Sequence, residues 1–262
     1  MPTFDATNAT RTAALALALA LFCCTAPLRA QTSWSLDAAA ERARVSLGQR
    51  DVSWGTNRIQ LSARTAPAAG WFVAAESQKR EHDTDTELIG GAYGRSGPWL
   101  WSAQASAAVD PGFLPRYAIE PQIGRRFGAV VVQGGAVYKS FADSRVRIGT
   151  VSLAGYRGDS ELELKLAYGD AQPLDRHIRV ATLRGLWDPG GAWSAGASVS
   201  AGQGLYDSTN VPGVRGNHGR VVNANLRYRF SGSYSLRIDL SDGRENPTFR
   251  ERRLGLALRK IF

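Results

Sequence analysis

The chain has 262 residues, a formal net charge of +9 and only two cysteines. Cys23 and Cys24 both lie in an apolar N-terminal run, so the rest of the sequence offers no disulfide, thiolate metal site or cysteine nucleophile. No later run approaches the roughly eighteen apolar residues that a transmembrane helix requires. If the chain crosses a bilayer, it must therefore do so with strands.

The first thirty residues predict a cleaved signal peptide. Arg11 precedes the apolar segment 13–26, and cleavage is expected between Ala30 and Gln31. Cleavage removes two arginines and one aspartate, so the net charge of +9 becomes +8. An exported basic chain is expected to meet anionic lipid or acidic solutes, and no nucleic-acid partner is predicted.

From residue 42 onward, apolar and polar residues alternate in short segments that end at turn signals. The segment 161–168, for example, places three leucines on one face and two glutamates and a lysine on the other. Because successive side chains of a strand point to opposite faces, this alternation predicts strands with one apolar face. The segments lie near 42–49, 57–65, 70–80, 86–95, 99–106, 116–126, 129–139, 145–156, 161–168, 177–187, 193–200, 222–230, 234–241 and 253–262.

Fourteen strands, an even number, predict an all-β fold: a transmembrane antiparallel up-and-down β-barrel, with twelve strands as the alternative. Short connections alternate with generally longer polar ones, such as 49–56, 81–86 and 203–219. This asymmetry is typical of short periplasmic turns and longer extracellular loops. We expect residues 31–41 to form a short periplasmic segment and residues 42–262 to form the barrel. Aromatic residues near the short turns predict a girdle at one membrane interface.

Two segments interrupt the alternation. The apolar phase shifts after Ile148 in the segment 145–156, and it shifts after Val180 in the segment 177–187. A β-bulge, which inserts one extra residue into a strand, would restore the register in each case. We therefore expect a bulge in both strands.

The polar faces of the strands carry many charges, which we expect to line the barrel lumen. One interpretation is a network of ion pairs that plugs a narrow barrel, and the other is a charged constriction that favours anionic solutes or an acidic glycan. A plug or narrow pore is favoured over an open channel. The predicted lumen-facing charges are Arg145, Arg147, Glu161, Glu163, Lys165, Arg227, Arg229, Arg237 and Asp239.

The C-terminal strand resembles the insertion signal that the barrel-assembly machinery reads. That signal combines a terminal phenylalanine, here Phe262, with apolar residues at alternate positions, here Leu254, Leu256 and Leu258. Lys260 departs from the pattern, because its place usually holds tyrosine or another apolar residue.

Most of the predicted barrel resembles the YaiO family of outer-membrane β-barrel proteins. The resemblance rests on Trp54 and on the stretches 90–95, 113–117, 124–128 and 249–262. It implies no catalytic motif and no settled transport substrate. Related barrels occur as terminal domains of exopolysaccharide exporters, so the resemblance implies a connection to polysaccharide.

Three histidines, His82, His177 and His218, fall at the ends of predicted outward loops. A barrel lipase would need serine, histidine and an acidic or polar partner within hydrogen-bond reach, and none of the three shows a His-x-Ser spacing. We predict solvated loop histidines and no enzymatic activity, with a lipid-modifying hydrolase as the alternative.

Asp83, Asp85 and Glu87 form an acidic cluster around the loop 81–86. Oxygen ligands of this kind bind divalent cations, but the cluster lacks the spacing of a complete Ca²⁺ loop. We expect a solvated acidic loop tip rather than a metal site.

Together these features predict an integral outer-membrane β-barrel that acts as a narrow pore or surface protein, with a link to exopolysaccharide export. An adhesive or structural surface barrel is a further alternative. The expected partners are outer-membrane lipid and lipopolysaccharide, the barrel-assembly machinery during insertion, and an anionic glycan or the exopolysaccharide machinery. No cofactor, catalytic residue or metal site is predicted.

Overall fold

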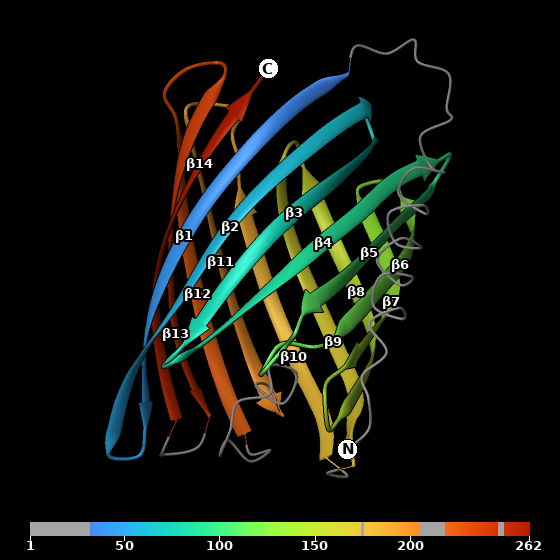
Figure 1. Cartoon of the computed structure of the whole chain (residues 1–262). Coiled ribbons are helices and arrows are strands. Elements are labelled where there is room, and N and C mark those ends of the chain that lie inside the picture. The colour runs from blue at the N-terminus through green and yellow to red at the C-terminus, as the bar shows by residue number, and fades with distance from the viewer. Residues whose placement is uncertain (1–31, 174–175, 205–217, 246–248) are drawn as a thin grey trace.

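The computed structural model describes residues 32–173, 176–204, 218–245 and 249–262 (Figure 1). The predicted signal peptide and most of the predicted loop 203–219 lie outside the described residues. In the described ranges, no helix is long and apolar enough to cross a membrane.

Within these ranges the chain forms fourteen strands, in agreement with the prediction. Their bounds are β1 Ser33–Leu47, β2 Arg50–Ala66, β3 Ala69–Arg80, β4 Asp83–Ser96, β5 Trp99–Val109, β6 Tyr117–Phe127, β7 Val130–Ser140, β8 Arg145–Arg157, β9 Ser160–Gln172, β10 Arg176–Trp187, β11 Trp193–Gln203, β12 His218–Arg229, β13 Tyr234–Glu245 and β14 Phe249–Ile261.

Each strand pairs with its neighbours in the sequence, and β1 pairs with β14 to close the barrel (Figure 1). All pairings are antiparallel, which confirms the up-and-down topology. Closure gives the backbone N–H and C=O groups of both edge strands hydrogen-bond partners, which lipid does not offer.

The barrel has two ends, which we name by their connections. The terminal rim holds the start of β1, the end of β14 and the turns 67–68, 97–98, 128–129, 158–159, 188–192 and 230–233. The loop rim holds the remaining connections, of which 48–49, 81–82, 110–116 and 141–144 are fully described.

The strands are longer than expected at both rims. Residues 33–41, expected as a periplasmic segment, belong to β1, because the closing pair with β14 begins at Ser35 opposite Ile261. At the loop rim, the expected loops 49–56 and 81–86 are tight turns at 48–49 and 81–82. Gly48 has a φ of 64°, a left-handed conformation that glycine adopts without a Cβ clash.

The apolar face of the strands is the outer surface of the barrel. Leu162, Leu164 and Leu166 are 59%, 47% and 50% exposed. The alternate residues Glu161 and Glu163 point into the lumen, where they form ion pairs with Arg184 of β10. An exposed row of leucines is stable only in an apolar solvent, so this arrangement is that of a membrane barrel.

Aromatic rings on the outer surface mark both ends of the apolar belt. Near the terminal rim, Trp34 packs edge-on against Trp71 at a centroid distance of 5.4 Å, and Trp193 contacts Tyr228 at 4.4 Å. Near the loop rim, stacked rings of Tyr117 and Tyr138 are 5.8 Å apart. Rings of this kind settle at membrane–water interfaces, so the belt between them is the membrane-spanning zone.

The expected bulges in β8 and β10 are wrong. Both strands pair with their neighbours in unbroken register, so the face of each residue follows from its parity. Val146 and Ile178 therefore point into the barrel, where they pack with Phe141 and Ala171 in a small apolar cluster.

The unbroken register of β8 also corrects two predicted lumen residues. Arg145 and Arg147 are exposed on the outer surface, on the same face as Val151 and Leu153. The side chains of β8 alternate between the lumen and the outer surface without interruption. What reverses near the loop rim is the polarity of the two faces: the apolar residues of this strand point into the lumen, and the charged ones point outward.

The outward orientation of the belt can be tested with two adjacent residues of β8. Val151 faces outward and is 50% exposed, while Thr150 faces the lumen. We expect Val151→Arg to lower the free energy of unfolding by about 2–4 kcal/mol, because it places a charge in lipid. Thr150→Arg should cost much less. Urea unfolding in liposomes, followed by the heat-modifiable gel shift, measures both variants, and equal losses would contradict the orientation.

Candidate functional site: the barrel lumen

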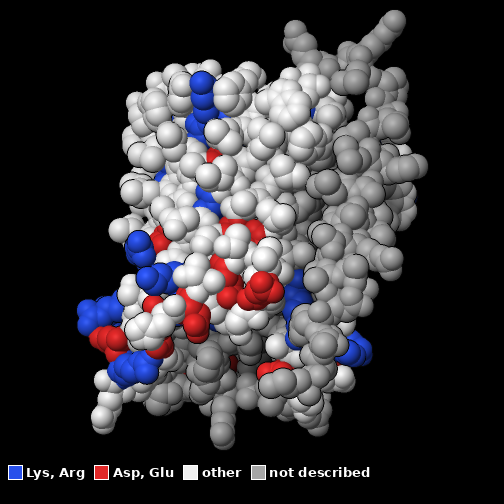
Figure 2. All heavy atoms as spheres, viewed as in Figure 1, with Lys and Arg blue, Asp and Glu red and all other residues white. Residues whose placement is uncertain are grey.

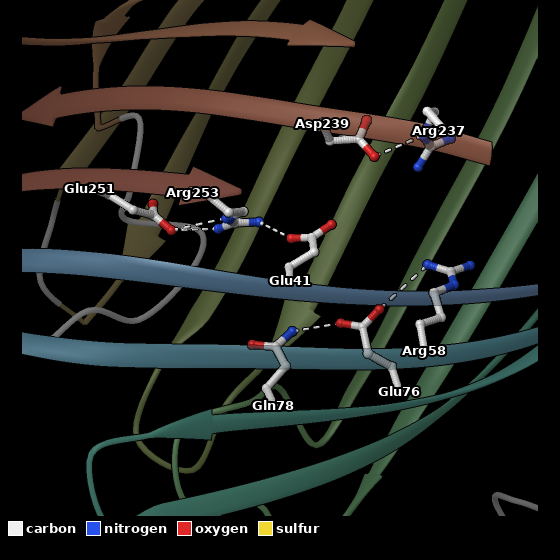
Figure 3. Close-up of polar contacts among 8 residues, drawn as sticks. All are labelled: Glu41, Arg58, Glu76, Gln78, Arg237, Asp239, Glu251 and Arg253. Atoms are coloured by element: carbon white, nitrogen blue, oxygen red, sulfur yellow. Dashed lines mark hydrogen bonds and ion pairs between the residues drawn. The ribbon is translucent and has the colours of Figure 1, made fainter. Parts of the chain in front are cut away.

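The lumen is built from every second residue of the fourteen strands, and its polar side chains form short ion-pair chains along the wall. On β14 and β1, Arg253 binds Glu251 at 2.6 Å and Glu41 at 3.0 Å (Figure 3). The Glu251 side chain is 6% exposed, so its charge depends on this partner.

A second, separate group of contacts lies on the neighbouring strands β2 and β3. Glu76 of β3 accepts a hydrogen bond from Gln78 at 2.7 Å and pairs with Arg58 of β2 at 3.5 Å (Figure 3). On the other side, Arg237 pairs with Asp239 at 2.8 Å within β13. This wall therefore carries opposite charges in near balance.

A further ion-pair group lies on β9 and β10. Arg184 contacts Glu161 at 2.5 Å and Glu163 at 3.3 Å. Lys165, two residues further along β9, also faces the lumen. The sequence predicted all three β9 residues on this face, whereas Arg184 was missed because the expected bulge in β10 obscured its orientation.

A group of four arginines lines the terminal half of the lumen on β12, β13 and β14: Arg227, Arg229, Arg237 and Arg259. Arg227 lies directly opposite Arg237 in the register. Arg229 pairs with Asp188, Arg237 with Asp239, and Arg259 with Asp37 at 2.6 Å. Among the described residues, Arg227 has no ion-pair partner, and its electrostatic neighbours are mainly the three other arginines. We call these four residues the lumen arginine group.

The loop 110–116 folds into the barrel at the loop rim, and Asp85 holds it there. The Asp85 carboxylate is 3% exposed and accepts hydrogen bonds from the backbone amides of Gly112, Phe113 and Leu114, at 3.0, 2.8 and 2.8 Å. Phe113 and Leu114 are buried as a result. The loop therefore lies against the inner wall of the barrel at this rim.

Aromatic rings on both sides fix the guanidinium of Arg80 beneath this loop. It lies 4.8 Å from the ring centroid of Trp54 and 4.3 Å from that of Phe113. A cavity of about 70 Å³ lies beside it, between Trp54, Gln78 and Glu251. That volume admits a few water molecules and falls well below the ~300 Å³ of a small-molecule site.

The acidic cluster is thus a lumen feature and not a loop tip. Asp85 and Glu87 are buried in β4, which begins at Asp83 and sends alternate residues inward. The available signal was the alternation of these acids with Thr84, Thr86 and Leu88. Among the described residues, no group of three or more metal-binding side chains is close enough together to hold a metal ion.

The three histidines are not assembled into one site. His82 lies in a turn, His177 is the second residue of β10, and His218 is the first residue of β12; both strand histidines are on the outer face. In the described part of the chain, no hydrogen bond joins any of them to a serine. The absence of enzymatic activity stays a prediction.

The residues of the predicted insertion signal lie on the outer surface of β14 and at its end. Leu254, Leu256 and Leu258 are exposed on the outer surface, and Phe262 follows them at the terminal rim. Lys260 is accommodated on the same face, with its ammonium 4.7 Å from the ring centroid of Phe262. Recognition by the assembly machinery stays a prediction.

No protein-family model and no curated protein matches the chain. Among solved structures, it is similar to the translocator domain of the autotransporter NalP from Neisseria meningitidis, with a TM-score of 0.50 and 11% identity over 98% of both chains. It is also similar to the KdgM porin in complex with disordered oligogalacturonate, with a TM-score of 0.50 and 10% identity over 87% of this chain and 99% of that one.

A third similar structure is a bacterial polysaccharide outer membrane secretin, with a TM-score of 0.51 and 6% identity over 88% of this chain and 97% of that one. Likeness at these identities establishes the fold alone. The chain therefore has the fold of outer-membrane β-barrels, and membership of the YaiO family stays a prediction.

The role of Asp85 can be tested by proteolysis. Each charge-assisted hydrogen bond contributes roughly 1.5–3 kcal/mol, so Asp85→Ala should release the loop 110–116. We expect trypsin to cleave the folded barrel after Arg116 at least about tenfold faster, because cleavage follows the population of the open loop. Mass spectrometry of the peptides measures the rate. Thr86→Ala, an outward change on the same strand, is the control, and equal rates for both variants would contradict the role of Asp85.

Proposed function

We propose that the chain resides in the outer membrane as a narrow, non-enzymatic pore that favours anions and passes an acidic glycan or a similar solute. The observation that carries the proposal is the lumen arginine group, in which Arg227 has no ion-pair partner among the described residues. A guanidinium that has no ion-pair partner and lies near other guanidiniums attracts an anion that enters the lumen.

The remaining lumen charges support selectivity of this kind. Arg253, Arg184 and Arg58 are matched by nearby carboxylates, so they contribute little net field. Within the lumen arginine group, Arg229, Arg237 and Arg259 also have carboxylate partners, so among the described residues Arg227 is the uncompensated charge of this group. With the short turns on the periplasmic side, a solute leaving the periplasm meets these arginines before it reaches the loop 110–116.

The nature of the solute is suggested by two similar structures. One is a porin solved with oligogalacturonate, an acidic oligosaccharide, and another is a polysaccharide secretin. A link to exopolysaccharide export also follows from the resemblance to the YaiO family. These likenesses support an acidic glycan as the solute, and deletion of the gene should then lower the amount of glycan secreted.

Ion selectivity in planar bilayers tests the pore. We expect the wild-type protein to conduct with a preference for anions. Arg227→Gln should lower the anion-to-cation permeability ratio by roughly two- to fivefold, because one charge acting at ~4 Å through water contributes about 1 kcal/mol. The reversal potential in a salt gradient measures this ratio.

The matched control is Arg220→Gln, which removes the same charge from the outer face of β12. It should leave the permeability ratio unchanged. A wild-type protein without conductance, or an unchanged ratio in Arg227→Gln, would overturn the proposed pore.

The proposed absence of enzymatic activity has its own test. The triple variant His82→Ala, His177→Ala and His218→Ala should leave the lipid A profile of the cell unchanged relative to the wild type. Mass spectrometry of extracted lipid measures the profile. A lipid species that is lost in the triple variant would establish the hydrolase instead.

A further inference from the structure

The net positive charge of the strands lies mainly on the outer surface, because most of their acidic residues face the lumen. Of the described strand residues with acidic side chains, only Asp51, Asp170 and Asp242 face outward. The outward-facing basic residues are Arg42, Arg44, Lys79, Arg125, Arg145, Arg147, Arg157, Arg179, Arg220, Arg244, Arg250, Arg252 and Lys260. This excess faces the surroundings of the barrel and not a solute in the lumen.

Six of these arginines form one group near the loop rim, on four consecutive strands across the closure. We call them the outer arginine patch: Arg220 of β12, Arg244 of β13, Arg250 and Arg252 of β14, and Arg42 and Arg44 of β1. In this patch, Arg244 lies directly opposite both Arg220 and Arg250, and Arg252 lies opposite Arg44. Like charges in opposed positions destabilise a sheet, so the patch requires compensating negative charge.

The protein supplies only part of that compensation. Asp242 alone contacts three members of the patch, with nitrogen–oxygen distances of 2.5 Å to Arg250, 3.3 Å to Arg252 and 3.6 Å to Arg244. Asp51 contacts Arg44 at 2.5 Å. In the described part of the chain, Arg42 and Arg220 have no ion-pair partner. The side chains of Arg44 and Arg252 are 74% and 60% exposed, so an external anion can reach them.

An apolar groove begins directly beside the patch, toward the terminal rim. The small side chains of Ala38 and Ala40 of β1 form its floor. Leucines of β13 and β14 line one side, and Ile59 of β2 lines the other. The register places Ala40 opposite Leu256, one outward position beyond Arg42 and Leu254. The groove has a volume of about 520 Å³. The patch and the groove thus share three strands, β1, β13 and β14.

On the front of the barrel, charged side chains of both signs gather over the lower part, where the β1–β2 hairpin lies, and a largely uncharged surface extends above them (Figure 2). Arginines at the edge of an apolar belt lie at the level of lipid head groups, while the belt lies at the level of the acyl chains.

We propose that the outer arginine patch and the groove together bind one molecule of lipid A, the phosphorylated and multiply acylated glycolipid that anchors lipopolysaccharide. The guanidiniums bind its phosphates, as arginine does in bidentate geometry, and the groove receives an acyl chain. The patch extends over three strand spacings, about 14 Å at ~4.8 Å each, which fits a head group with two separated phosphates. This surface is separate from the lumen and does not depend on the proposed pore.

Binding to the detergent-solubilised full chain tests the site, with native mass spectrometry and diphosphoryl lipid A as the probe. The double variant Arg42→Gln, Arg220→Gln removes the two patch arginines that lack an ion pair, so no carboxylate loses its partner. We expect its affinity for lipid A to fall at least about tenfold, which corresponds to ~1.4 kcal/mol.

The matched control is Arg125→Gln, Arg157→Gln, which removes two outward arginines at the terminal rim. Its affinity should stay within about twofold of the wild type. Phosphatidylglycerol, which carries a single phosphate, should bind more weakly than lipid A. Equal losses in both double variants, wild-type affinity in Arg42→Gln, Arg220→Gln, or equal affinity for the two lipids would each overturn the proposal.

The groove is tested separately with Ala40→Trp and the milder Ala40→Leu, which fill its floor from the lipid-facing side. We expect both to weaken binding of lipid A while leaving binding of a deacylated diphosphoryl head group unchanged. Unchanged binding of lipid A in both variants would contradict the proposal that the groove receives an acyl chain. Anion selectivity in bilayers of phosphatidylcholine should be the same in all these variants, so failure of the lipid site and failure of the pore are distinguishable.

Discussion

The fold depends on one constraint: backbone amides and carbonyls in a hydrocarbon medium must find their partners within the protein. A closed antiparallel sheet meets this requirement, and the pairing of β1 with β14 completes it. Closure then divides the side chains into two sets by parity alone, one facing lipid and the other facing the lumen. The exposed leucines of β9 and the ion pair of its glutamates with Arg184 are both consequences of that division.

Parity is also the reason why much of the fold could be predicted. The alternation of 161–168 was sufficient to orient β9, and the same argument gave fourteen strands and both faces of β12 and β13. It failed near the loop rim, where the medium on each side of the wall changes. There Val146 and Ile178 pack inside the barrel and Arg145 faces outward, so hydrophobicity no longer identifies the lipid face. The prediction took the apolar face of each strand to be the lipid face along its whole length, so it explained the change of face as a bulge.

The candidate site was predictable only in part. Glu161, Arg227 and Asp239 were placed in the lumen by periodicity, but which charges are paired depends on cross-strand register, which the sequence leaves open. The role of Asp85 was missed because its partners are backbone amides of the loop 110–116, and such contacts leave no mark on composition. The distribution of charge between the lumen and the outer surface was also not predicted from composition. The net charge of the chain says nothing about which side of the wall carries it, and the structure assigns most of the excess to the outside.

The pairing of β1 with β14 also bears on the order of assembly. Thirteen of the pairings join neighbouring strands through a single connection, whereas this seam joins segments more than two hundred residues apart, as the contact of Asp37 with Arg259 illustrates. Loop-closure entropy makes such a distant contact the slowest to form. A nearly complete sheet with two open edges must therefore precede the barrel. The ion pairs between β1 and β14, including Glu41 with Arg253, then form only when the barrel closes, and they stabilise the closed state.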